Sequence, residues 1–421
     1  MLTQEDNDLL TRVGPKTPMG QLMREYWVPA LLSSELPAAD GPPMRVMLLS
    51  EKLIAMRDTD GRVALFAEAC PHRGASLFYA QNKDCGLRCA FHGMKFDING
   101  KCTDMPLEHN GEHLKNKIRA KVYPCRELGG VIWAYMGPRE VPPPMPGIEV
   151  LSEKNLIVAA TYAEGNWLQH LETDLDFLHL RHLHKGILDL AKKYTKGDLP
   201  RHIEWLEKTE AHRIEVVDSS VGCTFGVCEE LTSEGDHCWG VGQFLMPFFG
   251  MLPQGPLGNH WITCRVPMDD YNTMTFGFIA GGHVASREQM FGEYDCQLPT
   301  DPDWFGRFRL KKNISNNFKI DRTLQNSTEN VATGSGLTGQ AVQDLAMACS
   351  LGPIADRSNE HLMPSDIMIA RVRQKLLSAV RDYQTKNKIP PGVDDPEIYR
   401  VKHGSVILPR DRKWNEAIDN V

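Results

Sequence analysis

The sequence lacks both an excess of basic charge and any long apolar run. Lys and Arg total 47 against 54 Asp and Glu, which gives a net charge of -7, so no basic field favours nucleic acid or an anionic membrane. No apolar run approaches the length of about 20 residues that spans a bilayer. The first residues also lack the basic and apolar regions of a signal peptide. We therefore expect a cytoplasmic protein that acts on small molecules, without nucleic-acid or membrane partners.

The 11 cysteines are an odd number that fits a reducing compartment better than a disulfide framework. Two of them lie in short loops that also contain histidine, namely 70–74 (CPHRG) and 89–93 (CAFHG). Each loop offers one sulfur and one nitrogen, which together make the ligand set of a Rieske [2Fe-2S] cluster. A structural zinc site uses the same residue types but more often pairs them as C-x2-4-C and H-x3-5-H. The predicted cluster ligands are Cys70, His72, Cys89 and His92.

The first 140 residues are predicted to form a β-rich domain that carries this cluster, with its core at about 44–138. Short apolar stretches flank Asp60-Gly61, a dipeptide that favours a hairpin turn. Residues 131–136 (VIWAYM) have the pattern of a buried strand. The proline-rich stretch that follows is unsuited to helix or central strand, so we interpret 141–150 as an interdomain linker.

Residues 151–421 are predicted to form a second, catalytic domain. Segments rich in Val, Phe, Thr and Gly occupy much of 212–283 and indicate strands, whereas 167–184 and 365–387 have helix-like spacing. The fold class is therefore α+β.

A second metal site is indicated within 176–184 (DFLHLRHLH). His179 and His184 lie about one and a half helical turns apart, so they converge on one metal only if the helix bends or ends between them. Two imidazoles and one distant carboxylate form the facial triad of non-haem Fe(II) oxygenases, which leaves positions open for dioxygen. Several acidic residues can supply that carboxylate, and periodicity does not choose among them. We interpret His170 and His182 as non-ligands.

Several separate motifs carry a family resemblance over nearly the whole chain. Beside the two cluster loops, they are 13–15 (VGP) with 17–20 (TPMG), 135–138 (YMGP), 166–169 (NWLQ), and the segment from Gln343-Asp344 through 352–357 (GPIADR). On these motifs the chain resembles the oxygenase component of Rieske non-haem iron oxygenases, specifically the phthalate-dioxygenase-like branch. The resemblance implies an antiparallel β Rieske domain and a catalytic domain with an antiparallel sheet and helices of the helix-grip, START-like type.

The same resemblance implies the remaining parts of the site and the partners. Asp344 is then the carboxylate ligand of a mononuclear Fe(2+), and Asp176 is the bridging acid that connects a cluster histidine of one subunit to His179 of its neighbour. Such proteins work as homotrimers or stacked trimers, because the two metal centres of one chain are too far apart for fast electron transfer. Electrons come from NAD(P)H through a separate reductase or ferredoxin. An acid three residues before a ligand histidine also suits an orienting role.

Two departures from the branch bear on the cluster and the substrate. Met94 stands where tryptophan is usual, and an apolar methionine can still shield the cluster. Glycines at 240, 242 and 250 stand where an arginine and two threonines are common, so we expect space for a bulkier aromatic acid. The alternative is that these glycines mark bulges or close packing. If the substrate is anionic, its candidate carboxylate partners are Arg213, Arg265 and Arg287, each of which is equally compatible with a solvated surface charge.

Within the resemblance, the favoured activity is O-demethylation of a bulky methoxylated, lignin-derived biaryl acid with release of formaldehyde, similar to 5,5'-dehydrodivanillate O-demethylases. The alternative is ring cis-dihydroxylation of phthalate, isophthalate or a chlorobenzoate. A hypothesis of another class is an electron carrier or a zinc-stabilised binding protein without oxygenase activity. The chain length and the second histidine pair oppose that hypothesis.

Overall fold

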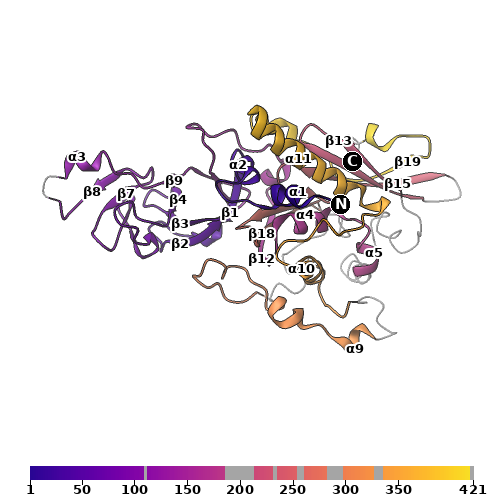
Figure 1. Ribbon diagram of the computed structural model, residues 1–421, viewed down its shortest axis with the longest axis horizontal. Helices are drawn as coiled ribbons and strands as arrows, with labels where there is room; N and C mark the ends of the chain where they lie inside the picture. Colours follow the sequence, from indigo (N-terminus) through magenta and orange to yellow (C-terminus); the bar gives the residue numbers. More distant parts are fainter. Residues whose placement is uncertain are drawn as a thin grey trace.

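The computed structural model describes residues 1–108, 111–184, 213–230, 235–253, 260–281, 297–326 and 335–417. The molecule is elongated, with small sheets at one end and one large sheet at the other (Figure 1). Its helices within the described ranges are α1 (Gln4–Thr11), α2 (Pro18–Arg24), α3 (Glu112–Lys115), α4 (Trp167–Leu175), α5 (Leu180–Leu183), α9 (Arg322–Gln325), α10 (Gln340–Ser350) and α11 (Ile367–Lys386). None of these helices is long and apolar enough to cross a bilayer.

Three small antiparallel sheets form the end that carries the cysteine loops. Their orders are β2-β3-β4-β9, β5-β6-β7-β8 and β1-β11-β10. The strands are β1 (Trp27–Leu32), β2 (Met44–Leu48), β3 (Glu51–Arg57), β4 (Val63–Ala67), β5 (Gln81–Asn82), β6 (Gly86–Arg88), β7 (Lys95–Asp97), β8 (Cys102–Asp104), β9 (Val122–Tyr123), β10 (Cys125–Leu128) and β11 (Val131–Tyr135). The predicted hairpin at Asp60-Gly61 joins β3 to β4, and the apolar run at 131–136 forms the buried strand β11. The antiparallel cluster region is therefore confirmed.

The proline-rich stretch after β11 is held against both neighbouring regions. The Trp27 indole Nε1 donates to the Pro143 carbonyl at 2.8 Å, and the Gly147 amide donates to the Pro396 carbonyl at 3.1 Å. Helices α1 and α2 pack on α11, so the N-terminal segment contacts the region predicted as catalytic. The domain limits at 140 and 150 stay a prediction.

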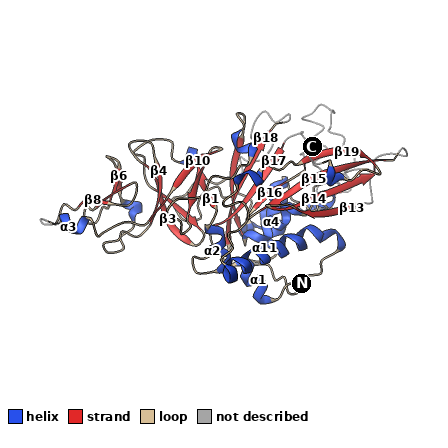
Figure 2. Cartoon of the chain, turned by 90° about the horizontal axis from the view of Figure 1, so that it is seen from above, coloured by secondary structure: helices blue, strands red, loops and turns tan. Residues whose placement is uncertain are grey.

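The other end of the molecule is built on one antiparallel sheet of eight strands. Its order is β12-β18-β17-β16-β15-β14-β13, and β19 pairs with the first part of β15. The strands are β12 (Ile157–Glu164), β13 (Arg213–Asp218), β14 (Gly222–Glu230), β15 (Asp236–Leu245), β16 (Phe249–Met251), β17 (His260–Pro267), β18 (Asn272–Ala280) and β19 (Gly404–Pro409). Helix α4 packs on β16 and β17, and α11 packs on β13 and β14 (Figure 2). The α+β class is confirmed.

The segment predicted as one helix over 167–184 contains two helices separated by a turn. Asn166 begins α4, because its side chain accepts a hydrogen bond from the Leu168 amide at 3.1 Å. The helix ends at Leu175, since Asp176 has an extended backbone and its carboxylate accepts from the Leu178 amide at 3.1 Å. The chain then enters the short helix α5. Because of this break, the residues after Leu175 do not continue along the axis of α4.

A buried ion cluster anchors α4 to the C-terminal third of the chain. Glu172 of α4 accepts hydrogen bonds from Arg357 at 2.8 Å and from Arg373 of α11 at 2.6 Å. Burial acts to raise the pKa of Glu172, but the two arginines outweigh it and lower that pKa. The anchored carboxylate lies only one turn before the end of α4. It therefore fixes the position from which the chain turns toward α5.

Candidate metal centres and active site

The two cysteine loops have the same backbone hydrogen-bond pattern. The Gly74 amide donates to the Cys70 carbonyl at 2.9 Å, and the Gly93 amide donates to the Cys89 carbonyl at 3.0 Å. Both glycines have positive φ, 76° and 74°, which a residue without Cβ adopts most easily. The loops thus share one tight turn, although the histidine follows its cysteine by two residues in the first loop and by three in the second.

The sulfurs of the two loops are buried, whereas the imidazoles lie toward the surface. Cys70 and Cys89 are each 3% exposed, and His72 is exposed. The His72 and His92 rings lie 4.7 Å apart between centroids at 72°. Burial, helped by Cys89, raises the pKa of Cys70 to about 11, so two thiolates side by side need bound iron to supply compensating positive charge. The donor set fits a [2Fe-2S] cluster whose histidine side lies toward the surface. Met94 is buried in the same apolar cluster as both cysteines, where it can shield the cluster as expected.

The second predicted site brings together three side chains from two distant parts of the sequence. Asp344, on α10, places Oδ1 3.3 Å from Nε2 of His179 and 2.8 Å from Nε2 of His184. One potential ligand atom from each residue lies within 4.8 Å of the others. The packing of α10 on α4 makes this meeting possible. His182 is exposed and does not belong to this group.

The outer hydrogen bonds of both imidazoles leave Nε2 available as a ligand atom. Nδ1 of His184 lies 2.6 Å from the Gln343 side-chain oxygen, and Nδ1 of His179 hydrogen-bonds to the Asp176 carbonyl. An oxygen acceptor at Nδ1 assigns the proton to that nitrogen and the lone pair to Nε2. Nε2 of His179 is buried without a hydrogen-bond partner among the described residues. Two neutral imidazoles and one carboxylate therefore fit Fe(2+) with positions left open.

The charges within this group favour a bound cation. Burial acts to raise the pKa of Asp344, but its contacts with His179 and His184 outweigh burial and hold that pKa far below its ordinary value. Burial acts to lower the pKa of His179, and Asp344 outweighs it and raises that pKa. The carboxylate is therefore ionised at neutral pH and attracts positive charge, which either a proton on His179 or a metal ion can supply.

Asp176 lies beside the metal group but does not enter it. Its carboxylate Oδ2 is 3.8 Å from Nδ1 of His179, and its side chain is 35% exposed. This geometry suits an acid that orients His179 from outside the metal and still reaches the surface. The bridging role of Asp176 stays a prediction, as do the ligand roles of the histidines, cysteines and Asp344.

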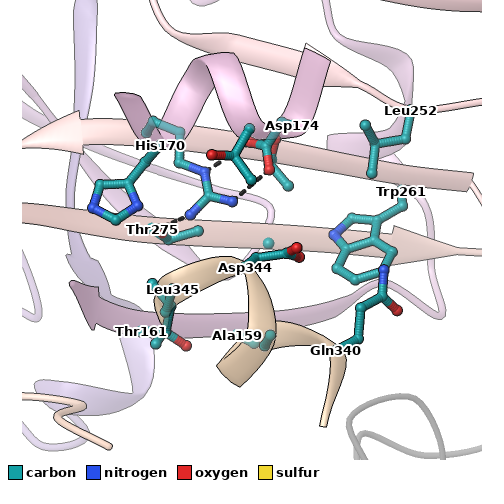
Figure 3. A pocket seen from close by; sticks show the side chains of 15 residues that line it. Ala159, Thr161, His170, Asp174, Leu252, Trp261, Thr275, Gln340, Asp344 and Leu345 are labelled. Carbon is teal, nitrogen blue, oxygen red and sulfur yellow. Dashed lines mark hydrogen bonds and ion pairs between the residues drawn. The ribbon is translucent and has the colours of Figure 1, made fainter. Parts of the chain in front are cut away.

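A cavity of about 70 Å³ begins at Asp344 and extends between α4, α10 and the sheet (Figure 3). Its walls combine Trp261 and Leu252 with four threonines, Thr161, Thr173, Thr263 and Thr275. The carboxylate of Asp344 points into this space. Because Asp344 belongs both to the metal group and to the cavity wall, the cavity lies next to the predicted metal site.

His170 also lines the cavity without acting as a candidate ligand. Its Nε2 lies 2.9 Å from the Glu164 carbonyl, and the residue is buried. Burial, and secondarily the positive charge of Arg265, lowers the pKa of His170 to about 3. The ring is therefore a neutral part of the wall.

The three arginines predicted as carboxylate partners differ in position. Arg265 lines the cavity, where its guanidinium binds Asp174 through Nε at 2.7 Å and Thr275 at 2.7 Å. Asp174 thus neutralises the charge of Arg265 from α4. Arg213 lies on β13 with Glu215 as its ion-pair partner and does not line this cavity. Arg287 lies outside the described residues.

Three glycines were predicted to enlarge the pocket, and at Gly242 the structure leaves no extra space. A Cβ on Gly242 would lie 2.3 Å from the Phe225 ring, and a Cβ on Gly240 would lie 3.4 Å from Pro253. A Cβ on Gly250 would lie 3.1 Å from the Thr263 hydroxyl. The expectation of freed space is wrong at Gly242, because the ring of a neighbouring strand already fills it. Close packing explains that glycine.

Sequence reasoning missed the residues that orient and surround the metal group. Gln343, 4% exposed, orients His184, and only its position next to Asp344 hinted at a role. Asp174 and Trp261 had no motif that marked them. Their place in the cavity depends on strand register and on the packing of α4, neither of which a local pattern contains.

Comparison with known proteins matches two family models to the two ends of the chain. The model described as "Rieske [2Fe-2S] domain" matches residues 26–124, and "LigXa C-terminal domain like" matches residues 134–419. The oxygenase part of carbazole 1,9a-dioxygenase, solved in complex with its ferredoxin, has a TM-score of 0.58 at 17% identity, covering 91% of this chain and 96% of that one. That likeness shows the fold.

Three curated relatives align over nearly the whole chain. The 3-chlorobenzoate-3,4-dioxygenase oxygenase subunit of Comamonas testosteroni is 38% identical, covering 100% of this chain and 98% of the relative. The phthalate 4,5-dioxygenase oxygenase subunit of Pseudomonas putida is 32% identical, covering 99% and 94%. The 5,5'-dehydrodivanillate O-demethylase oxygenase subunit of Sphingobium sp. is 31% identical, covering 95% and 84%.

Proposed function

The chain belongs to the Rieske non-haem iron oxygenases, as an oxygenase component of the phthalate-dioxygenase-like branch, and from that premise we propose that it dihydroxylates the ring of a small aromatic carboxylate. Its cofactors are a Rieske [2Fe-2S] cluster and a mononuclear iron. The finer proposal covers the substrate and the type of oxygenation. It rests on the size of the cavity beside Asp344.

The cavity favours a single aromatic ring over a biaryl. Its volume of about 70 Å³, as bounded by described residues, is below the roughly 150 Å³ of an engineered cavity that binds benzene. A single ring already needs the cavity to widen, and a second ring needs a much larger rearrangement of the packed side chains. The relative with 38% identity, named for 3-chlorobenzoate, points to the same substrate size. We accordingly place the bulky biaryl acid second.

The residues around the metal have separable tasks in this reaction. The iron, when bound, supplies the activation of dioxygen with electrons delivered through the cluster. His179 and His184 present Nε2 to it, held by Asp176 and Gln343, and Asp344 supplies the carboxylate. Trp261 and the cavity's apolar wall pack on the ring and exclude water. The threonine hydroxyls and Arg265 offer hydrogen bonds to the polar group of the substrate.

Arg265 is our proposed partner for the substrate carboxylate among the three predicted arginines, because it lines the cavity. A carboxylate reaching it must share the guanidinium with Asp174. Paired N–H donors favour a planar carboxylate, and a lysine offers a single ammonium instead. We expect Arg265→Lys to raise KM for an aromatic carboxylate more than it lowers kcat.

A single turnover tests the proposal. The reduced enzyme is mixed with oxygen and, in parallel, with 3-chlorobenzoate, phthalate, 3-methoxybenzoate or a methoxylated biaryl acid, and the products are identified by mass spectrometry. We expect a cis-diol carrying both oxygen atoms of O₂ from a single-ring acid. The isosteric variant Asp344→Asn is the matched control, since it keeps the cavity shape and weakens the metal group. Turnover of the biaryl acid alone would contradict the proposed cavity size.

O-demethylation is the second candidate, favoured by the O-demethylase relative that aligns over 95% of this chain. In that reaction one oxygen atom enters the methyl group, the hemiacetal releases formaldehyde, and the other oxygen leaves as water. The same turnover distinguishes the two activities. Formaldehyde with a phenol lighter by one methylene from 3-methoxybenzoate, and no diol from any acid, would replace dihydroxylation by O-demethylation.

We further propose a head-to-tail homotrimer or stacked trimers, with a separate ferredoxin or reductase as the electron donor. The strand β7 that follows the second cluster loop and the helix α5 beside the metal group lie toward opposite ends of the molecule (Figure 1). Electrons within one chain would have to cross that length. A neighbour that places its cluster beside the iron group removes this barrier.

Mixed oligomers test this arrangement. Cys89→Ser removes a cluster ligand, and His184→Ala removes an iron ligand, so each variant alone is expected to be inactive. Co-expression of the two should restore activity, because an intact cluster then meets an intact iron across a subunit boundary. Absence of restored activity in verified mixed oligomers would contradict electron transfer between subunits.

A further inference from the structure

Three pairs of histidine rings in this chain share one geometry. His72 and His92 lie 4.7 Å apart between ring centroids at 72°, and the rings of His179 and His184 lie 5.1 Å apart at 73°. A third pair, His260 and His403, lies 4.8 Å apart at 77°. The first two pairs are the predicted ligands of the cluster and of the iron. The third pair belongs to neither group.

The third pair lies on the side of the large sheet away from the cavity beside Asp344. His260 is the first residue of β17, and alternation along the strand directs it away from the face on which Trp261 lines that cavity. His403 directly precedes β19 and is 8% exposed. His260 is half-buried, so the pair is accessible from solvent on one side.

Both rings hold a buried nitrogen without a hydrogen-bond partner within the described part of the chain. These atoms are Nδ1 of His260 and Nε2 of His403. The hydroxyl of Ser405, two residues after His403, is also buried and unpartnered there. Buried polar atoms are nearly always hydrogen-bonded to protein or water or bound to an ion, so these three atoms leave room for a further partner beside the pair.

The protonation state of the pair suits a cation rather than an anion. Burial, and secondarily His260 and Lys402, lowers the pKa of His403 to about 3. Burial and Lys402 also lower the pKa of His260, while Glu153 acts to raise it. Two neutral imidazoles present lone pairs, which bind metal ions. The charge of Lys402 is offset by Glu149 at 3.4 Å.

We propose that His260 and His403 form a third metal site, which takes a divalent transition-metal cation such as Zn²⁺ with water in its remaining positions. The ring separation and inclination match those of the two pairs in the predicted metal centres. Imidazole nitrogen is a preferred ligand of zinc and copper. The bound cation joins the start of β17 to the segment before β19, two parts of the chain that lie far apart in sequence.

Zinc uptake by the iron-loaded enzyme tests the site. The full chain is incubated with Zn²⁺ alone and desalted, and zinc and iron per chain are measured by elemental analysis. We expect about one zinc gained without loss of iron, and a rise in melting temperature, because binding to the folded state stabilises it. His260→Gln and His403→Gln should each weaken zinc binding by about tenfold or more.

His237→Gln is the matched control, since His237 is a buried histidine of β15 outside the pair. It should bind zinc as the wild type does. His260 is only half-buried, so His260→Gln is expected to fold, and its cluster absorbance and iron content verify this. The proposal is overturned if the wild type takes up no zinc, if zinc uptake is matched by iron loss, or if His260→Gln binds zinc unchanged.

Discussion

Replacing Gln343 tests whether its hydrogen bond holds His184 in the orientation that binds the metal. Its side-chain oxygen accepts the hydrogen bond from Nδ1 of His184 at 2.6 Å, and its amide nitrogen donates to the Leu337 carbonyl at 2.9 Å. Gln343→Leu keeps a side chain of similar size and removes the acceptor. We expect the variant to fold, to keep its cluster and to lose iron from the mononuclear site.

The magnitude follows from the burial of this hydrogen bond. His184 is 2% exposed and Gln343 is 4% exposed, so water does not replace the lost acceptor. A buried donor left unpaired costs about 1–3 kcal/mol. That cost destabilises the metal-bound orientation of the His184 ring. It corresponds to a roughly 10- to 100-fold weaker affinity for Fe(2+), which is the range typical of residues that hydrogen-bond to a metal ligand.

Iron counting against a competing chelator measures the effect. The cluster contributes two irons, so total iron should fall from about three to about two per chain while the cluster absorbance stays. Gln340→Leu is the matched control, because Gln340 lies one turn earlier on α10, where it lines the cavity but does not belong to the group of His179, His184 and Asp344. Gln343→Glu should rescue iron binding, since it keeps an oxygen acceptor.

Two results would refute this reasoning. Full iron occupancy with unchanged affinity in Gln343→Leu would mean that the hydrogen bond does not hold His184 in its metal-binding orientation. Equal iron loss in Gln340→Leu would mean that any change in α10 disturbs the site.

Three further predictions concern the scaffold and the electron path. Glu172→Gln leaves the buried Arg357 without a counter-charge, while Arg373 keeps Glu360 as a partner, and should lower the free energy of unfolding by about 3 kcal/mol at pH 7. Because folding lowers the pKa of Glu172, its contribution is present above the ordinary value of 4.5 and is lost as pH falls through the native pKa. Urea titrations should therefore show the difference between wild type and variant shrinking below pH 4.5. Gly242→Ala, whose Cβ would lie 2.3 Å from Phe225, should cost about 1–3 kcal/mol in thermal melts, whereas equal melting of Gly242→Ala and the roomier Gly240→Ala would contradict the packing. Asp176→Asn should keep its iron but slow reoxidation of the reduced cluster in stopped-flow traces, and an unchanged rate would argue against a bridging role.

The cluster loops could be predicted from sequence because all four predicted cluster ligands lie within two short segments. The tight turns need only local glycines at 74 and 93, and the structure has both in the positive-φ conformation. The strand pattern around them was also local. A hairpin needs only a turn dipeptide and alternating apolar residues, which the sequence around Asp60-Gly61 contains.

The metal group of His179, His184 and Asp344 could be predicted only in part from the sequence. His179 and His184 share one short motif, but the spacing alone left open whether the helix continued through them. Asp176 decides this locally, because its carboxylate accepts the Leu178 amide and ends α4. Asp344 lies 160 residues from His184, and only the family resemblance selected it among many acids.

From the sequence alone we could predict the metal chemistry of this protein, namely its candidate cluster ligands and candidate iron-binding histidines, and its α+β fold. Tertiary structure decided what surrounds that chemistry. The meeting of α4 with α10, the neutralisation of Arg265 by Asp174, the cavity beside Asp344 and the contact of His260 with His403 all join residues that are distant along the chain. The physical reason is that ligand type is a property of single residues and local turns, whereas distance, burial and charge compensation arise only when separate elements pack together.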